Sequence, residues 1–368
     1  MAALSGVRVL DLSRLLPGGF ATLMLAELGA EVIKVEDPRG GDPIRQLPPF
    51  VAGRSVYDLL LNRGKRSVVL DLREPESVPV LDALVARADI VVESFRPATA
   101  RRLGVSGPQL REKYPRLVHA AITGYGQTGP YAERPGHDLN YVAVTGVLAA
   151  DRPHPAHLPK MFMADVGGGA MSAVVAMIAA LFARTTTGEG ASLDLSMQDA
   201  ALFWVMLPGA ADLVDGGAGA VGELPTFGEH ACYNIYETRD GRQVALGAME
   251  PKFWTTFCDA IGRPDLCGRH LTGPEDQAAV IRDVREVFCS RTQAEWLACF
   301  EGQDVCLSPV NSPAEAFADP NIAARGTVVQ GKGLRAVRSP FGHAPVPLGA
   351  APVLGQDTAD VLGALGIN

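Results

Sequence analysis

The chain has 368 residues, of which 47% are hydrophobic and 20% are charged, and its formal net charge is −8. This balance is typical of a soluble globular protein that is large enough for more than one domain. The negative charge argues against nucleic-acid binding, which usually needs a basic face, but it leaves room for an anionic small ligand in a local basic pocket. No secretory signal follows Met1, so we expect a cytoplasmic protein.

Two apolar stretches, residues 167–183 and 200–208, fall short of the ~20 residues that a membrane-spanning helix needs, and we expect both to be buried helices. The six cysteines all lie after residue 231, and none forms a C-x-x-C pair. We therefore expect buried free thiols, and neither a metal site nor a redox site.

In the first half of the chain, strand and helix patterns alternate. The predicted strands are residues 7–12, 31–35, 67–72, 90–93 and 117–123, and the predicted helices include 20–28 and 78–87. Pro17-Gly18-Gly19 indicates a turn after the first strand. Strand–helix–strand units of this length predict an α/β fold with a mostly parallel sheet covered on both faces. The G-x-G-x-x-G fingerprint is missing after the first strand, so we expect a Rossmann-like sheet that binds neither NAD nor FAD.

In the second half, the Gly/Ala-rich residues 216–222 indicate a linker, and a hairpin signal at residues 233–247 opens a smaller α+β domain. Helical patterns follow at residues 250–261, 280–289 and 293–301. The Pro-rich tail from Ser339 is expected to return to the large domain and to end in a helix at 358–365. The predicted divisions are a large domain at 1–190, linker helices at 191–225, the small domain at 226–310, and a linker with the returning segment at 311–368.

A histidine follows a Gly/Pro-rich loop in Gly136-His137-Asp138-Leu139-Asn140-Tyr141. Loops after sheet strands often carry the sites of α/β proteins, and a histidine there is a candidate general base because its pKa lies near neutrality. A structural histidine that caps a helix beginning near Leu139 is an equally good interpretation.

An aspartate precedes an apolar helix in Met163-Ala164-Asp165-Val166-Gly167-Gly168-Gly169. Asp165 is a good helix N-cap, which is the structural interpretation. The functional interpretation is that bare glycine N–H groups hold a thioester oxygen as it becomes enolate-like, while Asp165 exchanges a proton or attacks the carbonyl.

Basic residues form two groups, and arginines in such groups can bind phosphates through bidentate hydrogen bonds. A solvated surface is the alternative. The groups are Arg63, Lys65, Arg66 and Arg73, and then Arg96, Arg101 and Arg102. Glu250 lies directly before Pro251, where a plain helix start is also a sufficient explanation.

Taken together, these segments resemble the family III CoA-transferase superfamily of the CaiB/BaiF type, and within it the α-methylacyl-CoA racemases. The resemblance covers nearly the whole chain. Its blocks are residues 4–12, 28–36 (Leu-Gly-Ala-Glu-Val-Ile-Lys-Val-Glu), 63–67 (Arg-Gly-Lys-Arg-Ser), 123–130 (Thr-Gly-Tyr-Gly-Gln-Thr-Gly-Pro), 136–141, 164–169 and 247–254. Each block alone is a weak signal, but all of them in this order are a strong one.

The resemblance implies an acyl-CoA substrate, no cofactor beyond that CoA, and an interlocked homodimer whose active site joins one large domain to the small domain of the other copy. It implies that Asp165 is the catalytic aspartate, that His137 is its proton-transfer partner, and that Glu250 of the second copy orients His137. The implied CoA contacts are Arg39, Leu70, Asp71, Leu72, Arg73, Arg96, Gly136, His137 and Tyr141.

The sequence departs from the racemase pattern at two places. An arginine usually follows the acid that ends the second strand, whereas here that position is Asp37 and the nearest arginine is Arg39. The Leu-Asp-Gly-Gly-Ala-Pro segment before the small-domain strand is replaced by residues 227–232. His137 favours racemisation of a 2-methylacyl-CoA, and CoA transfer through an Asp165 anhydride remains the alternative.

Overall fold

The computed structural model describes residues 2–149, 158, 160–214, 226, 228–331, 333–341 and 349–367. The chain divides into two compact units, which are residues 1–209 with 327–368, and residues 210–326. The first unit therefore takes in residues 191–209, which the sequence pattern assigns to linker helices. The predicted linker at 216–222 and Phe227 lie outside the described residues, as do His154, His157 and His343.

A six-stranded sheet forms the centre of the first unit, in the order β5-β2-β1-β6-β7-β8. Its strands are β1 (Arg8–Asp11), β2 (Glu31–Glu36), β5 (Arg66–Val69), β6 (Ile90–Glu93), β7 (Val118–Thr123) and β8 (Ser192–Ser196). All five pairings are parallel. Counted along the chain, this order is the 3-2-1-4-5-6 order of the Rossmann fold, so the prediction of a parallel α/β sheet is confirmed. The sixth strand, β8, was not predicted.

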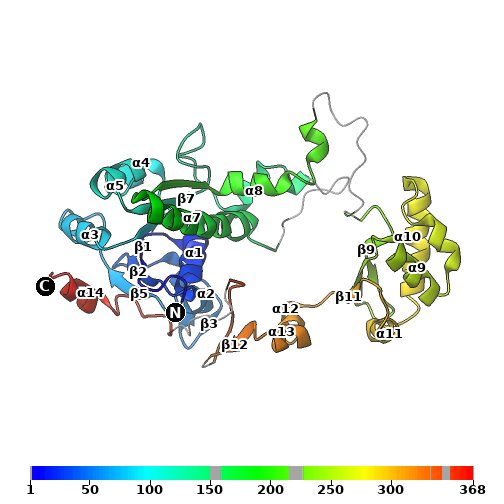
Figure 1. The fold of residues 1–368 in the computed structure, drawn as a ribbon. Coiled ribbons are helices and arrows are strands. Elements are labelled where there is room, and N and C mark those ends of the chain that lie inside the picture. The colour runs from blue at the N-terminus through cyan, green and yellow to red at the C-terminus, as the bar shows by residue number, and fades with distance from the viewer. Residues whose placement is uncertain are drawn as a thin grey trace. The chain divides into compact units, whose positions relative to one another are not determined.

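Alternate side chains of the strands point to opposite faces of the sheet, and each face has its own core. Val9, Val32 and Ile90 belong to the core under α1 (Leu15–Glu27) and α7 (Met171–Thr187), which pack against each other (Figure 1). Leu10 and Val91 belong to the core on the other face. That second face is covered by α3 (Ser77–Val85), α4 (Pro97–Arg102), α5 (Gly107–Lys113) and α14 (Thr358–Ala364).

Helix α1 begins at Leu15, so the predicted turn at Pro17-Gly18-Gly19 is wrong. Proline is tolerated there because the N–H groups of the first helical turn have no partner within the helix. Gly18 is required by packing, because a Cβ atom at that position would collide with the side chain of Ser13. The glycines therefore bring the helix close to the loop that follows β1.

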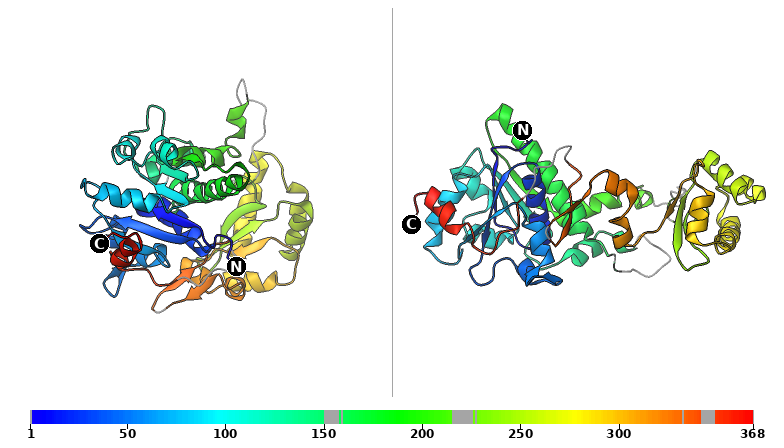
Figure 2. Two further views of the ribbon diagram at one scale, coloured as in Figure 1. Left: turned by 60° about the vertical axis from the view of Figure 1, so that its left-hand side comes forward. Right: turned by 90° about the horizontal axis from the view of Figure 1, so that it is seen from below.

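The C-terminal segment packs along β5, at the edge of the sheet (Figure 2). The carboxylate of Asp357 accepts a hydrogen bond from the Ser67 backbone N–H at 2.8 Å, and the Thr358 hydroxyl accepts one from the Val69 N–H at 3.0 Å. The guanidinium group of Arg54 donates to the Ala351 carbonyl at 2.9 Å. The segment thereby pairs backbone groups that an edge strand would otherwise expose.

Residues Met163–Thr187 form one continuous helix of 25 residues, and an 18-residue window within it has a mean hydropathy of 2.0, so the expectation that this stretch is too short to span a membrane is wrong. Its first two turns, Met163–Ala170, are a π-helix that leads into α7. Length and composition alone are weak evidence for a membrane span, because the core helix of a soluble protein passes the same test. This helix packs on α1 and β7 within the first unit.

The second unit has a three-stranded antiparallel sheet in the order β11-β10-β9. The sheet is built from β9 (Tyr233–Glu237), β10 (Gln243–Gly247) and β11 (Leu307–Pro309), and the larger helices are α9 (Pro251–Ala260), α10 (Pro274–Phe288) and α11 (Gln293–Cys299). Trp254, Phe257, Phe288 and Trp296 fill its core. The predicted hairpin is present, and its tip is closed by a hydrogen bond from the Gly241 N–H to the Thr238 carbonyl.

The remaining elements are short. They are α2 (Val56–Leu61), α6 (Asp138–Ala143), α8 (Met197–Val205), α12 (Pro313–Ala316), α13 (Pro320–Ala324), β3 (Phe50–Val51), β4 (Arg54–Ser55), β12 (Val328–Gln330) and β13 (Arg335–Val337). The cysteines are only partly as expected, because Cys232 and Cys258 are buried whereas Cys289 and Cys306 are exposed. Among the described residues, no group of three or more His, Cys, Asp or Glu side chains could hold a metal ion.

Candidate active site

The loop after β7 carries the predicted histidine to the carboxyl edge of the sheet. Tyr141 on α6 fixes this loop, because its hydroxyl donates a hydrogen bond to the carbonyl of Gly136 and its ring fills the space beside Gly124 and Gly136. A Cβ atom on Gly136 would lie 2.6 Å from that ring. The ring of Tyr125 packs edge-on against Tyr141, with 5.1 Å between the centroids. The glycines are therefore needed for close packing around the residue that precedes His137.

His137 is the N-cap of α6, and its side chain is exposed. Its backbone N–H donates to the side chain of Asn140 at 3.0 Å, which completes a capping box. The capping interpretation and the functional one are therefore compatible: the cap fixes the backbone of His137 and leaves the imidazole facing solvent.

Asp165 is the third residue of the π-helix rather than its N-cap, which is Phe162, so that prediction is wrong. The helix is capped from outside: one carboxylate oxygen of Asp138 accepts hydrogen bonds from the backbone N–H groups of Ala164 and Asp165, both at 2.8 Å. Asp138 is the first residue of α6, directly after His137. This cap therefore ties the histidine segment to the aspartate segment, although their sequence positions are far apart.

The carboxyl group of Asp165 is unusually easy to protonate. Burial and the negative charge of Asp138 raise its pKa to about 7. Within the described part of the chain, no hydrogen bond donor reaches its side-chain oxygens. A carboxyl group with these properties can exist in either protonation state near neutral pH, which is what a residue that both gives and accepts protons requires.

The glycines after Asp165 do not present free N–H groups, so the predicted thioester-oxygen site at these residues is wrong. The N–H of Gly167 already donates to the carbonyl of Phe162 at 3.1 Å. Gly168 and Gly169 instead let α8 approach closely: added Cβ atoms would lie 3.0 Å from the Ala200 side chain and 2.7 Å from the Met197 side chain, respectively. Glycine at these positions serves helix packing.

Two further predicted residues lie near this pair. Burial and the charge of Asp165 raise the pKa of Tyr141 to about 12, and the guanidinium charge of Arg96 partly opposes that rise. Tyr141 is thus a hydrogen bond donor throughout the physiological range. Arg96 is the exposed N-cap of α4, and its charge faces the same group of side chains.

A cavity of about 370 Å³ opens at the carboxyl ends of β1, β2, β5 and β6. Strand order reverses between β1 and β6, and ligands of open α/β sheets bind beside such a switch point. The cavity contains five of the residues predicted to contact CoA, together with two other arginines. The predicted ones are Arg39, Leu70, Asp71, Leu72 and Arg73, and the others are Arg14 and Arg102.

A buried charge network supports the wall of this cavity, and the sequence patterns did not reveal it. The ammonium group of Lys65 donates to the Thr22 hydroxyl at 2.7 Å and to the Asp11 carboxylate at 3.2 Å. Lys34 bonds the carbonyl of Ser13 at 3.0 Å. Burial opposes ionisation of Asp11, but the two lysine charges outweigh it and lower its pKa to about 2. The network fixes the loop between β1 and α1.

The predicted basic group at residues 63–66 is largely structural. Arg63 pairs with Glu27 and also bonds the carbonyl of Val337, while Lys65 is buried in the network around Asp11. Arg66 pairs with Glu31 at 3.2 Å. These side chains have acidic partners already and are positioned to hold the fold together.

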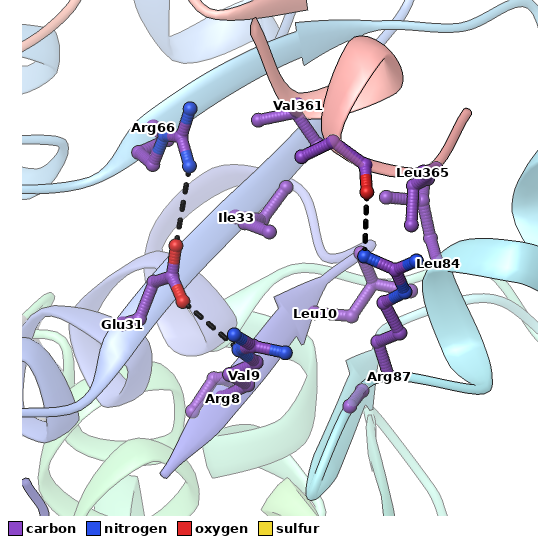
Figure 3. A pocket seen from close by; sticks show the side chains of 12 residues that line it. Arg8, Val9, Leu10, Glu31, Ile33, Arg66, Leu84, Arg87, Val361 and Leu365 are labelled. Atoms are coloured by element: carbon purple, nitrogen blue, oxygen red, sulfur yellow. Dashed lines mark hydrogen bonds and ion pairs between the residues drawn. The ribbon is translucent and has the colours of Figure 1, made fainter. Parts of the chain in front are cut away.

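A second cavity, of about 110 Å³, lies at the opposite, amino-terminal edge of the sheet (Figure 3). Arg8 and Arg66 share the carboxylate of Glu31 there, and Arg87 donates to the carbonyl of Ala364 at 2.7 Å. Each guanidinium group therefore has a partner within the fold. The cavity at the carboxyl edge, next to the loops that carry His137 and Asp165, is the better candidate for substrate binding.

Glu250 is the exposed N-cap of α9 in the second unit. It has the role of a plain helix start, because Pro251 occupies the first helical position. The structure describes the two units separately, so it does not test the predicted relation between Glu250 and His137.

Comparison with known proteins identifies the family to which the chain belongs. Residues 4–358 match CoA-transferase family III. The human alpha-methylacyl-CoA racemase is 32% identical over 345 residues, covering 89% of this chain and 82% of the relative. The human succinyl-CoA:glutarate CoA-transferase is also 32% identical, over 98% of this chain and 85% of the relative. A crystal structure of a CAIB/BAIF family protein from Brucella suis has a TM-score of 0.85 and 28% identity, over 99% of both chains. This chain, with its Rossmann-ordered sheet and its paired histidine and aspartate segments, belongs to CoA-transferase family III.

Proposed function

We propose that the protein racemises 2-methylacyl-CoA thioesters by exchange of the α-proton between His137 and Asp165. The observation that carries this proposal is the Asp165 carboxyl group, whose pKa burial and the charge of Asp138 raise to about 7. Because Asp138 also follows His137 directly, the cap on the π-helix joins the segment that carries His137 to the segment that carries Asp165, which supports the proposal. Racemisation by proton exchange between two groups requires that both face one carbon.

In the proposed reaction, one of the two groups removes the α-proton from one face of the carbon, and the electron pair moves into the thioester as a planar enolate. The other group then delivers a proton to the opposite face, and the electrons return to carbon. The thioester bond stays intact, so the chemistry needs no metal and no cofactor beyond the CoA of the substrate. Glu250 of a second copy would orient the imidazole of His137.

The nucleotide end of CoA fits the proposal best in the cavity at the carboxyl ends of β1, β2, β5 and β6, where Arg14 and Arg102 provide positive charge. The thioester end would then lie near Gly136, His137 and Asp165. Both places are on the same edge of the parallel sheet, so a single extended ligand can serve both.

A homodimer is part of the proposal. Large apolar side chains on α7 and α8 are exposed in the single chain, including Phe182 at 76%, Phe203 at 71% and Trp204 at 59%. Exposed apolar groups of this size usually mark an interface. We infer that a second copy covers them.

CoA transfer between carboxylic acids is the alternative, and the similarity to named CoA-transferases supports it. In that reaction Asp165 attacks the thioester carbonyl and expels CoA as a thiolate, which gives an acyl anhydride. The thiolate then attacks the Asp165 carbonyl to give an enzyme-bound CoA thioester and to free the carboxylate. Only Asp165 is required, and a nucleophile must be ionised, which a pKa near 7 allows for only part of the population at neutral pH.

Incubation of the enzyme with one epimer of 2-methylacyl-CoA in deuterated water separates the two reactions. Racemisation predicts deuterium at C2 together with loss of optical purity. Absence of exchange, with CoA passing to an added carboxylate, would establish transfer instead. The His137→Ala variant should lose racemisation and keep any transferase activity, so loss of both in a folded variant would refute the division of roles.

A further inference from the structure

The cavity has a carboxylate where the racemase pattern has an arginine. Asp37 follows β2 directly, and its oxygens accept hydrogen bonds from three nitrogen atoms of Arg39: the backbone N–H at 2.9 Å, Nε at 3.1 Å and Nη2 at 2.9 Å. Arg73 approaches the same carboxylate at 3.5 Å. The backbone hydrogen bond from Arg39 and that residue's guanidinium group lower the pKa of Asp37, so the group is ionised at neutral pH.

At the ends of β2 and β5, the positive and negative charges that line the cavity cancel. Arg39 is held by Asp37, and Arg73 is held by both oxygens of Asp71, at 2.7 Å and 2.6 Å. Two arginines therefore face two aspartates at the ends of β2 and β5. A phosphate placed here would meet two carboxylates as well as two cations, and it would have to displace existing bidentate ion pairs.

Two other arginines line the cavity. Arg14 and Arg102 make no ion pair within 4.0 Å with a carboxylate of the described residues, although the charge of Arg14 contributes to the lowered pKa of Asp37. The cavity thus has balanced charges at the ends of β2 and β5, and Arg14 and Arg102 add net positive charge. An anionic ligand group will prefer these two arginines.

In dinucleotide-binding sheets of 3-2-1-4-5-6 order, a carboxylate at the end of the second strand accepts hydrogen bonds from a ribose hydroxyl, whereas an arginine nearby accommodates a ribose phosphate. This sheet has the same strand order, and Asp37 directly follows its second strand. Resting on the proposed acyl-CoA function, we propose that Asp37 is a specificity-determining residue for the nucleotide end of the ligand. It accepts a hydrogen bond from the ribose and weakens the contribution of the ribose 3′-phosphate of CoA to binding.

The test compares dissociation constants of CoA and 3′-dephospho-CoA, measured by calorimetry on the full-length protein. The quantity of interest is the preference for the phosphate, defined as Kd of 3′-dephospho-CoA divided by Kd of CoA. Asp37→Asn should raise this preference about tenfold by tightening CoA alone, since two like charges at contact distance repel by enough to change affinity on that order. Retained binding of 3′-dephospho-CoA shows that the variant is folded.

Asp265→Asn is the matched control, because Asp265 holds Arg263 through the same two-residue bidentate pairing in the second unit. It should leave the preference unchanged, and an equal rise there would overturn the proposal. A preference that is unchanged or lower in Asp37→Asn would also overturn it. Failure of the unaltered protein to bind either ligand would overturn the acyl-CoA function itself.

Discussion

Asp138 offers the sharpest test of how the site is built, because two variants separate its hydrogen bonds from its charge. Asp138→Asn keeps an oxygen that can accept from the backbone N–H groups of Ala164 and Asp165, but it removes the negative charge. Asp138→Ala removes both. The two effects are read by different assays, one on stability and one on the pH dependence of catalysis.

Loss of a helix cap that serves two N–H groups costs about 2 kcal/mol, at the upper end of measured caps. For a unit of this size, that corresponds to a fall in Tm of about 4 to 8 °C for Asp138→Ala. Asp138→Asn should lose less, because its amide oxygen can still cap the π-helix. Calorimetric unfolding of both variants provides the comparison, and equal losses would show that the cap contributes nothing.

The charge acts on Asp165, whose pKa is raised to about 7 first by burial and then by Asp138. Removing that charge lowers the pKa of Asp165, but only part of the way to its usual value because burial persists. The rate of deuterium exchange into the substrate can be measured as a function of pH. The step in this pH–rate profile that reports the ionisation of Asp165 should shift to lower pH in Asp138→Asn. A step that stays in place or shifts to higher pH would refute the assigned electrostatics.

Three further predictions follow from the packing. Gly169→Ala should lower Tm by several degrees, because its Cβ would lie 2.8 Å from a backbone oxygen. Gly167→Ala should be tolerated, because the nearest atoms lie 3.9 Å from its Cβ. Equal Tm values for the two variants would contradict this prediction. Asp11→Asn should lower the free energy of unfolding, measured with urea, by about 3 to 5 kcal/mol, because it leaves Lys65 buried without its carboxylate partner. The pKa of Asp11 is lowered to about 2 in the fold, so its contribution to stability is present above about pH 4 and is lost as the pH falls towards 2. Tyr141→Phe should lower the free energy of unfolding by about 1 kcal/mol, because the ring still packs but its hydrogen bond to the carbonyl of Gly136 is lost. It should also slow exchange of the substrate's α-proton. An unchanged exchange rate would show that this hydrogen bond does not position the loop before His137.

The central sheet could be predicted because strands buried on both faces are short apolar runs, and five of its six strands were found that way. The sixth, β8, alternates polar and apolar residues and carries Asp194, so it lacks that signal. The start of α1 was missed because Pro17 and the following glycines usually indicate a turn, whereas here they permit tight packing against Ser13.

The two candidate residues of the site could be predicted from local patterns, but the contact that links their segments could not. Asp165 and His137 each occupy a position that a helix cap would explain, and the residue that links them is Asp138, whose partners lie 26 and 27 positions away. A contact over that separation has no local signature. Lys34 is a parallel case: a lysine inside an apolar strand pattern hints at a buried charge, but its partners are set by the fold.

Epimer-specific exchange is the measurement that tests the central claim most directly. If His137 and Asp165 act on opposite faces of the α-carbon, His137→Gln should exchange the α-proton of only one epimer of 2-methylacyl-CoA in deuterated water, and Asp165→Asn should exchange that of only the other. Neither variant should racemise. Loss of exchange for both epimers in both folded variants, or CoA transfer without any exchange in the unaltered protein, would contradict the account.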